Sequence, residues 1–123
     1  MKIIYASEKL KTVCTSAKAA RKFFGGNDAL ARSLMSRINA IEQSIVLTDI
    51  ILMPSFHFHS LHNKGRKKYQ DFYAIDVKSR TDAWRIILQP LNENEEPYDS
   101  CNIDEIARFV RIVEITEVSK HYE

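Results

Sequence analysis

The sequence predicts an α+β domain in which an N-terminal helical hairpin packs on one face of a small, mainly antiparallel β-sheet. Three observations predict this fold. A short apolar segment opens the chain, two stretches with helical spacing of apolar residues follow it, and after Pro54 the apolar residues alternate. With 123 residues, 45% hydrophobic residues and three glycines, residues 1–123 are expected to form a single domain with a buried core.

The helical hairpin is predicted from its capping residues and its apolar stripes. Residues 2–6 are short and apolar enough for a first strand, after which the Ser7 hydroxyl can accept an amide of a helical first turn. Gly25-Gly26 ends this helix, and its apolar residues recur at Leu10, Val13, Cys14, Ala17 and Phe24. A second helix should pack antiparallel to the first, with an apolar stripe of Leu30, Leu34, Ile38, Ile41 and Ile45.

The joints of the second helix are less uniquely defined. Either Asn27 or Asp28 can cap its start. Residues 46–53 are apolar but include two polar positions, so they either extend the helix or begin a loop, and Pro54-Ser55 ends them.

The second half of the chain is predicted to be strands. Alternation places strands around residues 56–59, 72–77 and 84–89, with turn-like joints at 63–65 and 79–82. Residues 92–102 read as a polar, acidic loop. Residues 109–118 are apolar on both faces in their first half, as expected for a central strand.

The charges are distributed unevenly, although the net charge is only +2. Between residues 57 and 89, three aspartates oppose seven basic residues: Lys64, Arg66, Lys67, Lys68, Lys78, Arg80 and Arg85. Residues 90–105 are acidic and contain no basic residue. The basic block fits a polyanion, and a solvated hairpin surface explains the charges at least as well.

Targeting features point to a cytoplasmic protein. No apolar run is long enough to span a bilayer, and the first residues lack the pattern of a signal peptide. Cys14 and Cys101 lie far apart without metal-ligand spacing, so we expect reduced thiols. Motifs of serine hydrolases, phosphate-binding loops and dinucleotide-binding folds are missing.

Arg85 is the first candidate site residue. If Trp84 and Ile86 face the helices, Arg85 points to the opposite face, and Asp76 does the same on the preceding strand. A guanidinium on an open sheet face can hold a phosphate through two parallel hydrogen bonds. The alternative is a cross-strand ion pair between Arg85 and Asp76.

The histidines allow two interpretations. His57 and His59 would share one face of a strand, which suits zinc, but no third and fourth ligand is evident and His62 has the opposite parity. We therefore expect no metal, and expect one or two of these histidines to face RNA or solvent.

Two further segments carry candidate groups. The basic run Lys64–Tyr69 either contacts RNA or forms a charged hairpin tip that protects a sheet edge. Lys120, His121 and Tyr122 supply proton-transfer and anion-holding groups at the end of the chain, where a frayed tail is the alternative.

Three motifs, in this order, resemble the HigB-like killer proteins of the RelE group of toxin–antitoxin toxins. Residues 58–66, Phe-His-Ser-Leu-His-Asn-Lys-Gly-Arg, are similar to the hairpin "His-x-Leu-Lys-Gly". Residues 73–77 and 83–87 are similar to a strand pair whose second member carries "Trp-Arg-Ile". Residues 115–122 are similar to the terminal "Glu-Val-x-x-Tyr-His". With the helical hairpin included, the resemblance covers essentially the whole chain.

The resemblance implies a RelE-like fold and a ribosome-dependent endoribonuclease that cuts messenger RNA and needs no metal or cofactor. It also implies a partner, a HigA-like helix-turn-helix antitoxin. Arg85 would hold the phosphate, Lys64 would be the hairpin lysine and His121 the terminal acid or base. The implied catalytic set also contains His62, Lys120 and Tyr122, and the implied RNA-binding set is His59, Arg66, Lys67, Lys68, Lys78 and Arg80.

The sequence departs from the resembled pattern at two places. The hairpin is two residues longer, so His62 can occupy the place of the lysine, and His121-Tyr122 reverses the usual terminal order. The assignment of base and acid stays open. A gyrase-binding toxin of the ParE type, without nuclease activity, is the alternative function, and an inactive antitoxin-binding relative is a third.

Overall fold

The computed structural model describes residues 1–61, 71–99 and 102–120. Its first strand is β1 (Lys2–Tyr5), and α1 (Glu8–Thr15) begins after Ser7, whose side chain accepts from the amide of Leu10 at 3.1 Å. Both elements confirm the predictions from residues 2–7.

The first predicted helix is in fact two helices. It is interrupted at Ser16, whose extended backbone ends α1 and whose hydroxyl accepts from Ala19 at the start of α2 (Ala17–Phe23). The pair Gly25 and Gly26, at φ of 65° and 90°, ends α2 as predicted, because glycine adopts positive φ without strain.

The second predicted helix is α3 (Asp28–Gln43), and Asn27 is the residue that caps it. Ile45 lies beyond its end and is 67% exposed, so the prediction that it completes the apolar stripe was wrong. Residues 46–53, predicted either to extend the helix or to begin a loop, contain a separate short helix, α4 (Leu47–Ile51). Pro54 starts the short 3-10 helix η1 (Pro54–Phe56).

The strands of the described residues form one mixed sheet in the order β1-β5-β4-β3-β2. Its members after β1 are β2 (His59–Ser60), β3 (Tyr73–Asp76), β4 (Trp84–Leu91) and β5 (Ile112–Lys120). β5 pairs parallel with β1 and antiparallel with β4, and the β3–β4 and β2–β3 pairs are antiparallel. The α+β class and the mainly antiparallel sheet are thus confirmed, and β5 is the inner strand expected of the apolar C-terminal segment.

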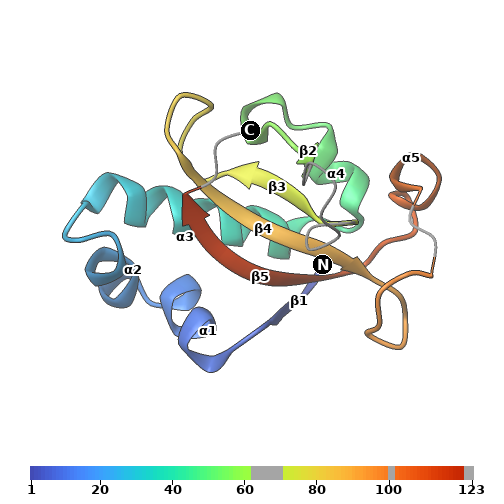
Figure 1. The fold of residues 1–123 in the computed structure, drawn as a ribbon, viewed down its shortest axis with the longest axis horizontal. Helices are drawn as coiled ribbons and strands as arrows, with labels where there is room; N and C mark the ends of the chain where they lie inside the picture. Colours follow the sequence, from blue (N-terminus) through green and yellow to red (C-terminus); the bar gives the residue numbers. More distant parts are fainter. Residues whose placement is uncertain (62–70, 100–101, 121–123) are drawn as a thin grey trace.

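The core lies between the helices and one face of the sheet. Figure 1 shows α3 running behind β3 and β4, with α1 and α2 beside it. Leu34 and Ile41 of α3 are buried with Ile75, Ile86 and Ile115 of the sheet. Between β4 and β5 the acidic loop turns at residues 92–96 and is followed by α5 (Ile103–Ile106), which the sequence did not predict.

In the part of the chain that the structure describes, every helix is too short or too polar to span a bilayer.

Candidate functional site

Arg85 and Asp76 lie directly opposite each other on β4 and β3. Ile86 and Leu88 belong to the core under the helices, whereas Ile87 belongs to a separate apolar cluster on the other face. The predicted parity of Arg85 is therefore correct. The prediction that this face is open at Arg85 was wrong, because Arg85 is only 5% exposed and Asp76 only 1%.

This second face is covered by apolar side chains of its own. Leu61, Ala74 and Ile87 are buried together, and Phe72 packs against them. Strand alternation specifies which face a side chain occupies, but it does not specify whether another segment lies on that face. The burial of Arg85 therefore could not be read from the sequence.

The Arg85 guanidinium is engaged by its own hairpin. Nε lies 3.2 Å from Oδ1 of Asp76, which is the ion pair that the sequence left as an alternative. Nη1 donates to the carbonyls of Trp84 at 2.9 Å, of Ser79 at 3.4 Å and of Asp82, and Nη2 donates to the carbonyl of Arg80 at 3.1 Å. Arg85 thus organises the turn between β3 and β4 and is not a free phosphate ligand.

Asp76 is shared between Arg85 and a histidine. Its Oδ1 also lies 3.4 Å from Nδ1 of His57. Its Oδ2 is buried and has no hydrogen-bond partner within the described part of the chain. An unpartnered buried carboxylate oxygen is costly, so the surrounding structure holds this group in place at the expense of stability.

His57 and His59 form a compact imidazole pair. Their ring centroids are 4.6 Å apart, and Nδ1 of His59 is 2.7 Å from the carbonyl of His57. That carbonyl can only accept, so Nδ1 of His59 carries the proton and Nε2 is left with a lone pair. Nε2 of His59 is buried without a hydrogen-bond partner among residues 1–61, 71–99 and 102–120.

The two histidines do not share a strand face as the sequence predicted. His59 belongs to β2, but His57 precedes it in the left-handed conformation, at φ 50° and ψ 52°, where it ends η1. No group of three or more histidine, cysteine, aspartate or glutamate side chains in the described ranges could hold a metal ion.

Arg37 of α3 is a member of the site that the sequence analysis missed. Its Nε donates to the carbonyl of Asp76 at 2.9 Å, and its Nη2 donates to the carbonyl of Ser55 at 3.1 Å. The guanidinium stacks on Phe56, 4.2 Å from the ring centroid. Burial lowers the pKa of Arg37 and the nearby Asp76 opposes this shift. A signal existed in the position of Arg37, beside the apolar stripe of α3.

Three of the predicted cations are exposed near Arg85. Lys78 and Arg80 lie in the β3–β4 turn, and Lys120 lies across from Trp84 with Nζ 5.7 Å from the ring centroid. This turn and the last residues of β5 meet at one end of the sheet (Figure 1). The remaining predicted site residues lie outside the described residues: His62, Lys64, Arg66, Lys67, Lys68, His121 and Tyr122.

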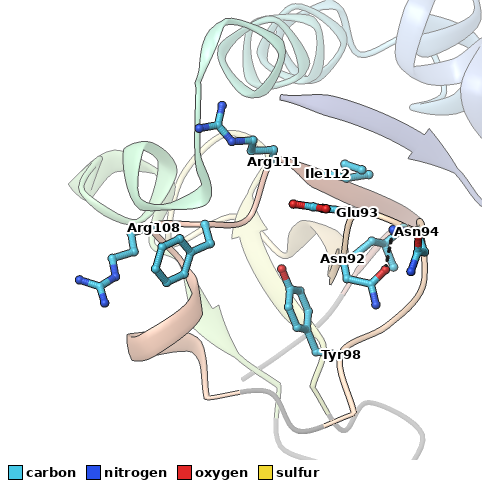
Figure 2. A pocket seen from close by; sticks show the side chains of 9 residues that line it. Asn92, Glu93, Asn94, Tyr98, Arg108, Arg111 and Ile112 are labelled. Carbon is cyan, nitrogen blue, oxygen red and sulfur yellow. Dashed lines mark hydrogen bonds between the residues drawn. The ribbon is translucent and has the colours of Figure 1, made fainter.

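A separate pocket of about 460 Å³ lies at the opposite end of β4, where Leu91 and Ile112 line it. Figure 2 shows Tyr98 and Glu93 pointing into the hollow, whereas the guanidinium groups of Arg108 and Arg111 point away from it. None of the predicted site residues that the structure describes lines this pocket. The pocket holds a carboxylate and a phenol but no histidine, whereas the polar cluster around Asp76 holds two histidines.

Compared with protein-family models, with curated proteins and with solved structures, the chain matches none of them. The chain is an α+β protein with helices on one sheet face and a buried polar cluster on the other. The particular members of that cluster are His57, His59, Asp76 and Arg85, with Arg37 beside them.

Proposed function

We propose that the chain is a HigB-like, RelE-fold toxin that cuts messenger RNA on the ribosome. The observation that carries the proposal is the grouping of exposed Lys78, Arg80 and Lys120 at the end of the sheet where His57 contacts Asp76. The support from sequence is the order and spacing of the three motifs that resemble HigB-like proteins.

The chemistry requires few groups. The 2′-hydroxyl of RNA attacks the adjacent phosphate, a base takes its proton, an acid protonates the leaving 5′-oxygen and cations hold the phosphorane. DNA lacks the 2′-hydroxyl and is not a substrate. Exposed Lys78, Arg80 and Lys120 would hold the RNA, while Arg85, being committed to Asp76 and four carbonyls, would shape the turn that carries two of them.

The proposal includes a partner and a compartment. A toxin of this kind is neutralised by a HigA-like helix-turn-helix antitoxin and acts in the cytoplasm, where ribosomes translate. A small helix-turn-helix gene next to this one would support the pairing.

One observation favours a second candidate function. Arg85 is used within the chain, which removes one argument for a nuclease and leaves room for a ParE-like toxin that binds gyrase without cutting RNA. The two candidates share a fold and differ in their cellular effect.

Expression of the chain without an antitoxin separates the two. We expect growth arrest with shortened messages, read by primer extension a few minutes after induction, and no DNA-damage response. Intact messages with an induced DNA-damage response would replace the nuclease by the gyrase-binding candidate. Intact messages with normal translation and growth would contradict both.

A further inference from the structure

We propose that His57 is the general base of the RNA-cleaving site, and that the buried Asp76 is its positioning residue. The inference rests on the proposed function. Its substrate is an RNA phosphodiester, held beside His57 by the exposed cations of the β3–β4 turn.

The first support is the link between Asp76 and His57. Asp76 is buried, Arg85 holds its Oδ1 from one side, and Nδ1 of His57 lies 3.4 Å from the same oxygen. A carboxylate at Nδ1 selects the tautomer with its proton on that nitrogen, which leaves Nε2 free to accept a proton. The same carboxylate stabilises the imidazolium that forms when Nε2 accepts a proton.

The second support is accessibility. The His57 side chain is 28% exposed, whereas Asp76 and Arg85 are almost fully buried. Of His57, Asp76 and Arg85, His57 is therefore the side chain that a substrate can contact. Nε2 of its neighbour His59 is buried, so His59 is not an equivalent choice.

The third support is the backbone at His57. Its φ of 50° is unusual for a residue other than glycine, and such conformations persist where the surroundings hold them. Here Arg37 binds the carbonyls of Ser55 and Asp76, and the His57 amide donates to the carbonyl of Pro54. These contacts hold residues 54–57 in the conformation that places His57 beside Asp76.

The surrounding charges fit the proposed step. Arg85 and Arg37 flank Asp76, the His59 ring lies against His57 at a tilt of 30°, and Lys78 follows β3. In the step, Nε2 of His57 takes the 2′-hydroxyl proton as the 2′-oxygen bonds to phosphorus. The bond from phosphorus to the 5′-oxygen breaks, and water supplies the proton that the leaving oxygen needs.

The test is single-turnover cleavage of a short message on programmed ribosomes, compared between wild type and His57→Asn. Asparagine tolerates the left-handed conformation and its amide can donate to Asp76, but it cannot transfer a proton. We expect a fall in rate of about 100- to 10,000-fold. The pH profile of cleavage should also differ between the two proteins, because asparagine has no titratable proton to exchange.

A second variant separates chemistry from folding. His57→Gly relieves the backbone conformation and leaves space for a free imidazole, so added imidazole should restore part of its cleavage. Asn39→Ala, on the exposed surface of α3, is the matched control and should cleave like wild type.

The outcomes are distinguishable. Wild type that leaves messages intact refutes the proposed function, and the role of His57 falls with it. Wild type that cleaves, together with His57→Asn that cleaves at a similar rate and with the same pH dependence, overturns the role of His57 alone. If His57→Asn does not fold, failure of imidazole to restore cleavage by His57→Gly overturns it.

Discussion

Asp76 and Arg85 are buried as a pair, so each depends on the other. Removing one partner leaves a charge in the interior without compensation. Arg85→Ala should therefore destabilise the domain by about 3–5 kcal/mol, because it leaves the buried Asp76 without its ion-pair partner and four carbonyls of the turn without their donor. Chemical denaturation followed by circular dichroism measures this.

The control is Arg80→Ala, which removes an exposed cation next to the same turn and should change stability by less than about 0.5 kcal/mol. A stability of Arg85→Ala equal to that of the control would contradict the structural role of Arg85.

Asp49 should make the stability of the fold depend on pH in the acidic range. The amides of Ile45 and Val46 donate to its carboxylate and lower its pKa. Because the folded pKa is below the unfolded value of about 3.9, its contribution is present above that value and is lost as the pH falls through the lowered one. The melting temperature of Asp49→Ala should thus lie below that of wild type at neutral pH and approach it in strong acid. A gap that stays constant down to low pH would contradict this assignment.

Cys14 should be unreactive in the folded protein. It is 1% exposed, and burial raises its pKa to about 12, so the nucleophilic thiolate is scarce near neutral pH. Alkylation by iodoacetamide, read by mass spectrometry of the Cys14 peptide, should be slow in buffer and fast in denaturant. Equal rates would mean that the region around α1 opens readily.

At the scale of elements, Ser16 explains the break between α1 and α2. Its side chain accepts from the amide of Ala19, which is a helix N-cap in the middle of the predicted helix. Ser16→Ala should lower the unfolding free energy by about 1 kcal/mol, and Ser16→Asp should retain most of the wild-type value. If Ser16→Ala is neutral or stabilising, the two helices are held by packing alone and the cap contributes nothing.

The elements that the sequence predicted well are those with strong local signals. Apolar spacing and caps placed α1 and α3, and alternation placed β3, β4 and the inner strand β5. Ser16 was missed because the apolar spacing continues through it. Phe109, expected to open the last strand, is 63% exposed and precedes β5, because contact with β1 starts only at Ile112.

The sequence predicted which sheet face the site residues occupy, but it did not predict which groups they contact. Parity placed Arg85 and Asp76 together, since adjacent strands bring same-parity residues opposite each other. Three features depend on tertiary packing: the burial of that face, the left-handed backbone at His57 and the contacts of Arg37 from α3. Because of them, His57 rather than Arg85 is the side chain that a substrate can contact.

The polar cluster and the pocket of Figure 2 are at opposite ends of β4. If cleavage occurs at the cluster, Tyr98→Ala should leave the cleavage rate unchanged, because Tyr98 lines the distant pocket. The readout is primer extension on messages in a translating extract. A large loss of cleavage, with the domain still folded, would place the RNA or the ribosome in the pocket instead.

Metal chelation tests whether the proposed cleavage needs a metal ion. Attack by the 2′-hydroxyl needs no metal hydroxide, so chelation of zinc with magnesium held constant for the ribosome should leave cleavage unchanged. Stoichiometric zinc in the purified protein, with activity lost on its removal, would refute a metal-independent reaction.

The most direct measurement is the chemistry of the cut ends. Messages cleaved in the presence of the protein are isolated, and their new termini are identified by selective ligation and phosphatase treatment. Attack by the 2′-hydroxyl predicts a 2′,3′-cyclic phosphate on the upstream fragment and a 5′-hydroxyl on the downstream fragment, with far fewer cuts for His57→Asn. A 5′-phosphate on the downstream fragment, or no cut ends at all while growth still stops, would contradict cleavage by this route.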